Sequence, residues 1–371
     1  MRMSTPQAGD GASLDVNLEI LVSARESRGL TQSDVAAAIG VSQGLISKFE
    51  DGLTALTRER LVLIAEFLGF PLSLFLEPDR IRSGASACLY HRKRKTLPAK
   101  ILNRLQSSMY LTTVHTDRLL REVIIESDRT FHTMDLDEYN GSPVRVAQAL
   151  RAAWRVGPGP IKNLTRLIEH AGGVIVMAPF GTHKLFGMSC WGKVGRPLFY
   201  LNSEMPTADL RWTLAHELGH LTMHASAPLG DAELEADEFA REFLCPVSEF
   251  RPQVKDLTFK DLPSLKAYWK ISMKAIIKSA NAIDAIPTAR AVSLYKQYNN
   301  RKYQVDEPYP VSSEPPHLLR DAMLVHLNEH NYSMQELATI AHLSLDDFEV
   351  GLASDVVPRG FGNIINLTPS K

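Results

Sequence analysis

The sequence predicts a multidomain, mainly α-helical protein with one smaller domain of mixed α and β structure. Residues 17–77 hold five short amphipathic patterns with a helical period. Further along, the apolar runs 174–177 and 198–201 are typical of strands and lie among helical patterns. The chain has 371 residues, enough for two or three domains, and 44% of them are hydrophobic, as in ordinary globular proteins.

Charge, hydropathy and cysteine usage indicate the class and compartment of the protein. The net charge of −1 neither favours nor excludes nucleic acid, so that question depends on local surfaces. No apolar stretch is long enough to span a bilayer, and residues 1–11 lack the apolar segment of a signal peptide. Cys88, Cys190 and Cys245 are widely spaced, which favours free thiols in a reducing compartment. We therefore expect a cytoplasmic protein without a membrane partner.

The first predicted domain spans residues 15–78 and is a bundle of short helices. Thr31, Ser42 and Thr57 precede helical patterns and are favoured N-cap residues. Gly40 separates the second pattern from the third. Two helices joined by a tight turn with glycine are typical of the helix-turn-helix motif, whose second helix enters the major groove of double-stranded DNA. In this bundle the recognition helix would be the third.

The expected recognition helix has polar residues at its N-terminal end. Glutamine can pair with adenine through two hydrogen bonds, and serine or lysine can contact a base edge or a phosphate. Gln32, at the start of the preceding helix, is placed to contact a phosphate. The predicted DNA-binding residues are Gln32, Ser42, Gln43, Gly44, Ser47 and Lys48. The alternative is a bundle that contacts protein, because its surface is not strongly basic and phosphate contacts dominate affinity for DNA.

Two further regions are predicted to be helical without a chemical role. Residues 79–142 are expected to form a basic and helical linker, in which the basic run 91–95 precedes an amphipathic pattern. We favour a solvated linker over an arm that binds nucleic acid, because only Tyr90 offers an aromatic ring beside that run. Residues 291–371 are expected to form a C-terminal helical module. Part of it imitates a second helix-turn-helix, but its third helix is acidic and would repel phosphate.

The run Trp212–His220 has the residues of a metal site. His216 and His220 are four residues apart and therefore lie on one face of a helix, where both imidazoles can reach one ion. Glu217, beside the first histidine, can accept a proton from metal-bound water. Apolar neighbours of the motif indicate a buried helix. A lone HExxH pattern is weak evidence, but its setting here is favourable.

The acidic helical pattern 231–244 is expected to supply the third ligand. A catalytic zinc takes three protein ligands and leaves one position open for water. Glu235 is preferred because Ala236 beside it allows the helices to pack closely, and Glu233 and Glu238 are the alternatives. Asp237 could orient a ligand histidine from behind. A site with two histidines and a glutamate favours zinc, Zn²⁺, over manganese.

The predicted catalytic domain spans residues 143–290. A small sheet beside the HExxH helix could present an edge strand, which would hold an extended peptide across the metal by backbone hydrogen bonds. Phe186 and Trp191 are candidates to line that cleft, although ordinary core packing is the favoured interpretation for both.

These segments together resemble the ImmA/IrrE metallopeptidases. The resemblance rests on residues 197–202, 210–220, 235–240 and 244–246, roughly the middle third of the chain. It implies a zincin-like, gluzincin-type catalytic domain in which His216, His220 and Glu235 hold zinc and Glu217 is the general base. Asp237 stands where the family often has asparagine, and Cys245 where it usually has methionine. Residues 30–52 resemble the Xre-type, lambda-repressor-like helix-turn-helix domain.

The sequence therefore predicts a transcriptional regulator that binds DNA and carries a zinc-dependent endopeptidase. Characterised members of the resembled family cleave specific repressors, which implies a repressor or antitoxin-like protein as substrate in a stress response. The alternative is a non-proteolytic regulator whose metal site is structural or sensory. Glu217 distinguishes the two, because a structural site has four protein ligands and no need of a base. The oligomeric state stays open, with a homodimer as one option.

Overall fold

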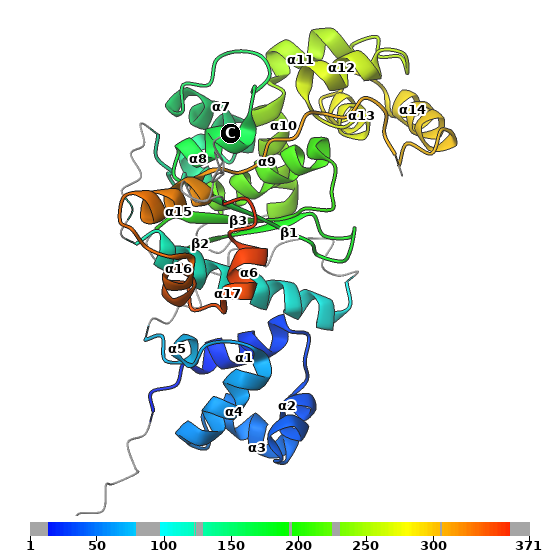
Figure 1. Cartoon of the computed structure of the whole chain (residues 1–371). Coiled ribbons are helices and arrows are strands. Elements are labelled where there is room, and N and C mark those ends of the chain that lie inside the picture. The colour runs from blue at the N-terminus through cyan, green and yellow to red at the C-terminus, as the bar shows by residue number, and fades with distance from the viewer. Residues whose placement is uncertain are drawn as a thin grey trace, which may run out of the picture. The chain divides into compact units, whose positions relative to one another are not determined.

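The protein folds as two compact units in the computed structural model (Figure 1). The structure describes residues 14–78, 97–121, 123, 129–192, 195–224, 231–304 and 306–356. The first unit contains the N-terminal helices together with Pro98–Leu119 and His326–Ser354, and the second is built mainly from Leu120–Val325. Residues 1–11, the basic run 91–95 and Cys88 lie outside the described residues. The mainly α-helical, multidomain fold class is confirmed.

The five short helices predicted for the N-terminal bundle are all present. They are α1 (Leu18–Ser27), α2 (Gln32–Ile39), α3 (Gln43–Glu50), α4 (Arg58–Leu68) and α5 (Leu72–Phe75). Thr31 and Thr57 accept capping hydrogen bonds at the starts of α2 and α4. Gly40 ends α2 with a φ of 70°, a left-handed conformation that glycine adopts without a steric penalty. Ser42 holds the N-cap position of α3, but its side chain makes no capping hydrogen bond.

The first unit also includes helices from the regions predicted as linker and C-terminal module. These are α6 (Ala99–Leu119), α16 (Met334–Ile340) and α17 (Leu345–Gly351). Helix α6 packs along α1, where Asn103 and Ser107 donate hydrogen bonds to the carboxylate of Glu26. Arg118 on α6 forms an ion pair with buried Glu77 and donates to the carbonyl oxygen of Ile340. The predicted ranges 79–142 and 291–371 are therefore each divided between the two units.

The second unit is built around a three-stranded sheet in the order β1-β3-β2. Its strands are β1 (Val174–Ala178), β2 (Gly187–Trp191) and β3 (Pro197–Asn202). Strand β3 pairs in parallel with β1 and antiparallel with β2, so β2 is an edge strand. The runs predicted as strands form β1 and β3, whereas β2 was not predicted because its sequence has no continuous apolar run. Trp191 at its end packs edge-on against Phe131 at a ring distance of 6.2 Å.

Helices pack against this sheet and against one another and supply the rest of the core. They are η4 (Leu136–Tyr139), α7 (Pro143–Ala153), α8 (Leu164–His170), α9 (Thr207–Met223), α10 (Ala232–Leu244), α11 (Val247–Val254), α12 (Leu262–Trp269), α13 (Met273–Ala282), α14 (Thr288–Asn300) and α15 (Leu318–Asn328). The pattern 262–282 predicts one helix but forms two, because Lys270 ends α12 in a left-handed conformation and Ser272 caps α13.

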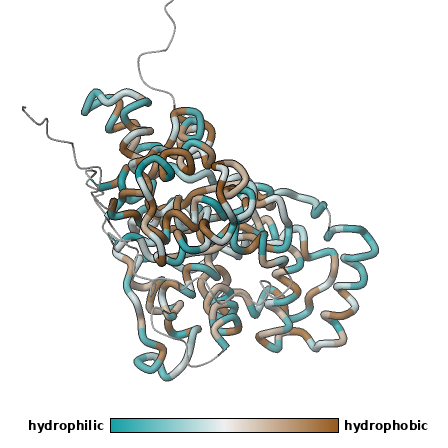
Figure 2. The backbone as a smooth tube through the Cα atoms, turned by 90° about the horizontal axis from the view of Figure 1, so that it is seen from below, coloured by the Kyte–Doolittle hydropathy of each residue, from teal (hydrophilic) through white to brown (hydrophobic). Residues whose placement is uncertain are grey.

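Apolar and polar residues alternate along the helices, as the brown and teal stretches of the tube show (Figure 2). Among the described residues, no helix combines the length and the apolar character that a transmembrane span requires. The apolar faces are instead buried within each unit.

A buried ion pair ties the segment before α15 to α9. Arg211 on α9 pairs with Glu314, and both side chains are almost fully buried, with 2% and 7% of their surface exposed. Glu314 also accepts a hydrogen bond from the backbone nitrogen of Leu164 at the start of α8. This pair therefore holds in place the helix that carries the HExxH motif.

We expect Glu314→Ala to lower the free energy of unfolding of the second unit by about 3–5 kcal/mol, because it leaves the buried guanidinium of Arg211 without its counter-ion. All four tryptophans lie in this unit, so urea denaturation followed by tryptophan fluorescence reports on it. Asp321→Ala is the control. Its pair with Arg320 is exposed and is worth about 0–1 kcal/mol. Equal effects of the two substitutions would contradict a structural role for the buried pair.

Candidate metal centre and nucleic-acid interface

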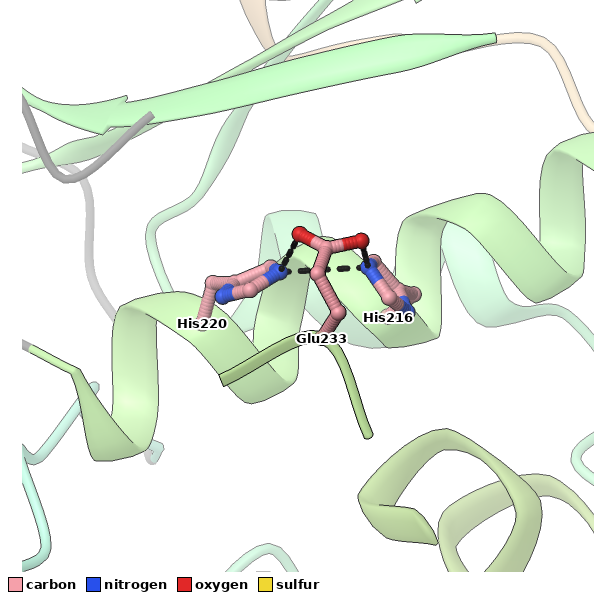
Figure 3. A group of neighbouring side chains, drawn as sticks. All are labelled: His216, His220 and Glu233. Atoms are coloured by element: carbon pink, nitrogen blue, oxygen red, sulfur yellow. Dashed lines mark hydrogen bonds and ion pairs between the residues drawn. The ribbon is translucent and has the colours of Figure 1, made fainter. Parts of the chain in front are cut away.

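The two histidines of the HExxH motif converge on one face of α9 (Figure 3). Their Nε2 atoms lie 3.1 Å apart, and both side chains are buried. The apolar neighbours Leu214, Ala215 and Leu218 are buried as well, so the motif lies on an interior helix as its sequence predicts. Two imidazole nitrogens this close, with lone pairs toward one point, can share a single metal ion.

A glutamate from α10 completes the group, and it is Glu233. Its Oε1 lies 3.4 Å from Nε2 of His220, and its Oε2 lies 3.8 Å from Nε2 of His216. Within the described part of the chain, His216, His220 and Glu233 are the group whose ligand atoms all lie within 4.8 Å of one another. Two imidazoles and one carboxylate suit zinc and leave a coordination position for water. The donor set present therefore fits a catalytic rather than a structural ion.

Glu235, the ligand preferred from the sequence, does not join this group. Its Oε2 instead lies 2.9 Å from Nε2 of His224. Residues two apart on a helix differ by about 200° around its axis, so Glu233 and Glu235 cannot face the same point. Ala236 is fully buried, as expected, but this packing turns Glu233 toward the histidines. Glu238, the other alternative, is not part of the group either.

The rotation and closeness of α10 depend on Gly219, between the two histidine positions of α9. A Cβ atom at Gly219 would lie 2.9 Å from the ring of Phe239 on α10, closer than carbon atoms normally approach. The glycine therefore allows the two helices to touch. This contact explains how a side chain from the first turn of α10 reaches the histidines.

The carboxylate of Glu217 is buried against strand β2. Only 1% of this residue is exposed, and its Oε2 accepts a hydrogen bond of 2.7 Å from Oγ of Ser189 on β2. Ser189 was not among the residues predicted from the sequence, because the strand that carries it was not predicted. The strand thus fixes the side chain that the motif suggests as general base.

Asp237 lies behind His216, where the sequence suggested an orienting residue. Its Oδ1 is 3.3 Å from Nδ1 of His216, and its Oδ2 is 2.6 Å from Nζ of Lys278 on α13. Burial would raise the pKa of Asp237, but the hydrogen bond with His216 and the charge of Lys278 outweigh it and hold that pKa well below its usual range. The aspartate is therefore ionised and can fix the ring of His216.

A cavity of about 420 Å³ opens beside the candidate metal centre. His216 and Glu233 form part of its wall, and β2 contributes Gly187 at its edge. The rest of the wall combines the apolar residues Leu185, Phe186, Trp212, Leu234 and Ala275 with charged groups from Asp209, Asp237, Lys274 and Lys278. Phe186 thus lines the cleft, whereas Trp191 packs against the core. The cavity is large enough for a bulky side chain next to the ligand group.

In the first unit, the residues predicted to contact DNA lie at the start of α2 and along α3, with Lys48 in the last turn of α3. Nε2 of Gln43 donates to Oε1 of Gln32 at 2.7 Å, and Nε2 of Gln32 donates to Glu50 at 2.8 Å. Arg25 holds Glu50 through two hydrogen bonds. Ser42, Gln43, Gly44 and Lys48 are exposed, and Ser47 is half-buried and donates to Asp51. The side-chain amides of the two glutamines are therefore held in place by hydrogen bonds before any contact with DNA.

Two family models match parts of the chain. Residues 21–75 match the helix-turn-helix family, and residues 168–281 match the peptidase family described as the IrrE N-terminal-like domain. The first match covers most of the N-terminal bundle, and the second covers the sheet together with α9, α10 and α13. No curated protein matches the chain.

Proposed function

We propose that this chain, which joins a helix-turn-helix domain to an IrrE N-terminal-like domain of metallopeptidase type, is a transcriptional regulator with a zinc-dependent endopeptidase. The observation that supports peptidase activity is the convergence of His216, His220 and Glu233. Glu217 lies on α9, the helix of the two histidines. A structural zinc site has four protein ligands and no base next to it, so this donor set supports catalysis over the structural alternative.

The residues of the site have different tasks in peptide hydrolysis: three would hold the ion, and Glu217 would be the base. His216, His220 and Glu233 would hold the ion, which when bound polarises the scissile carbonyl and lowers the pKa of water. Glu217 would be the general base, whose carboxylate can hold a proton from the attacking water and return it to the leaving amine. Ser189 keeps the carboxylate of Glu217 in place through its hydrogen bond.

The edge strand and the cavity suggest how a substrate is held. A segment of extended peptide can pair with the open edge of β2 and so run past the candidate metal centre. A large apolar side chain next to the scissile bond would enter the 420 Å³ cavity. The substrate is therefore an extended or unfolded stretch of protein rather than a compact surface.

We infer that the substrate is one specific protein, a repressor or antitoxin-like partner that is removed during a stress response. The support is the covalent link to a DNA-binding domain, which would bring the peptidase to the operators that such a repressor occupies. For the same reason we expect both activities in the cytoplasm. The test compares new protein N-termini in a cell extract after treatment with zinc-loaded or with chelator-treated protein. We expect one or a few zinc-dependent cuts. A broad digest, or none in an extract of stressed and unstressed cells, would contradict the proposal.

We further infer that the first unit binds double-stranded DNA through α3. Gln43→Ala should relax sequence preference at one position, because the fixed amide reads a base edge. Lys48→Ala should weaken binding to all DNA sequences, as expected for a lost phosphate contact. It should also reduce by about 1 the slope of the logarithm of the binding constant against the logarithm of the salt concentration. Binding is measured by fluorescence anisotropy at several salt concentrations. Lys260→Ala, an exposed lysine of the second unit, is the control. An unchanged preference and slope in both α3 variants would favour a protein-contact role for the bundle.

A further inference from the structure

A third histidine follows the two of the motif at the same spacing. His224 lies four residues after His220, at the C-terminal end of α9, and only 3% of it is exposed. Its Nδ1 lies 2.9 Å from Nδ1 of His220, and its Nε2 lies 2.9 Å from Oε2 of Glu235. Glu235 is thus joined to His220 through two hydrogen bonds in series, although it does not reach the ligand group itself.

The positions of the protons in this series follow from the chemistry at its two ends. Nε2 of His220 points to Glu233 and His216, so it needs a lone pair to bind a metal, and the proton of that ring then sits on Nδ1. Nδ1 of His220 donates to Nδ1 of His224, which leaves the second ring protonated on Nε2. That Nε2–H donates to the carboxylate of Glu235, which only accepts. Every donor meets an acceptor in this arrangement.

The reverse arrangement is electrostatically unfavourable. If His224 carried its proton on Nδ1, the lone pair of its Nε2 would face the carboxylate oxygen of Glu235 at 2.9 Å. The same tautomer would force the proton of His220 onto Nε2, directed into the ligand group. The negative charge of Glu235 therefore selects the tautomer of His224, which in turn selects that of His220.

We propose that Glu235 and His224 are positioning residues, which fix the ring orientation and the metal-binding tautomer of His220. This inference rests on the proposed metal centre. It gives each ligand histidine its own carboxylate: Asp237 contacts Nδ1 of His216 directly, and Glu235 acts on His220 through His224. Such partners behind a ligand typically change metal affinity about 10- to 100-fold when removed.

The first test measures zinc affinity of the full chain by competition with a chelator. Glu235→Gln should lower the affinity about 10- to 100-fold, because the amide can donate to Nε2 of His224 and favour the wrong tautomer. Glu238→Gln removes the same charge from the same helix and should leave affinity nearly unchanged. His224→Ala should have an effect similar to Glu235→Gln, and the double variant should lose no more than either single one, because both act through one path.

The second test reads the tautomers, which a merely structural contact between the helices would not set. Long-range ¹H–¹⁵N spectra of histidine-labelled protein should show His224 protonated on Nε2, in the zinc-loaded and the zinc-free protein, and a change of this pattern in Glu235→Gln. A wild-type His224 protonated on Nδ1, or equal affinities of the Glu235 and Glu238 variants, would overturn the inference. If Glu233→Ala leaves zinc affinity unchanged, the proposed metal centre itself is refuted. This outcome is distinct from a failure of the positioning role alone, in which Glu233→Ala still loses zinc.

Discussion

Replacing Glu217 with glutamine is expected to abolish cleavage while the protein keeps its metal and its fold. The amide has nearly the shape of the carboxylate, and its oxygen can still accept the hydrogen bond from Ser189. It cannot take the proton from metal-bound water, and general-base catalysis of this kind is worth about 10²–10⁴-fold in rate. The measurement is the rate of appearance of the new N-terminus in the partner protein, with zinc content determined on the same sample.

The same variant separates the two functions of the chain. DNA binding by Glu217→Gln should equal that of the wild type, because α3 and α9 belong to different compact units. A variant that cleaves its partner at the wild-type rate would show that Glu217 is not the base. A wild type that cleaves nothing with zinc restored, together with a cellular phenotype indifferent to the substitution, would favour a regulator whose metal has no catalytic role.

The second large effect concerns the metal ligands. His216→Ala, His220→Ala and Glu233→Ala should each purify without stoichiometric zinc, because each substitution removes one of three ligands. No other side chain takes the place of the lost ligand. Glu235→Gln, in contrast, should reach full occupancy when zinc is in excess, since it weakens a ligand without removing one. Elemental analysis after dialysis against buffer with and without added zinc distinguishes these cases.

Full occupancy in the Glu233→Ala variant, combined with metal loss in a Glu235→Ala variant, would return the third ligand to the residue that the sequence favours. In that case α10 would have to rotate by about half a turn relative to α9. Gly219 offers an independent check, because Gly219→Ala should push α10 away from α9 and lower zinc affinity without touching a ligand.

Local chemistry alone fixes much of this protein. The starts of α2 and α4 follow from Thr31 and Thr57, whose hydroxyls accept hydrogen bonds from backbone groups three residues away. The approach of His216 and His220 follows from the pitch of one helix, so it needs no tertiary contact. Each of these features depends on residues within about one turn of each other, and a single sequence contains that information.

Other features of the site depend on how two elements pack against each other. The choice of Glu233 over Glu235 depends on the rotation of α10 about its axis, which the packing of Phe239 on Gly219 sets. Ser189 reaches Glu217 because β2 pairs with β3 beside α9. The helical period tells which face of α10 a glutamate lies on. Which element that face contacts depends on how apolar side chains from distant segments pack in the core. That burial free energy is summed over the whole unit, so it cannot be assigned from the pattern of one helix.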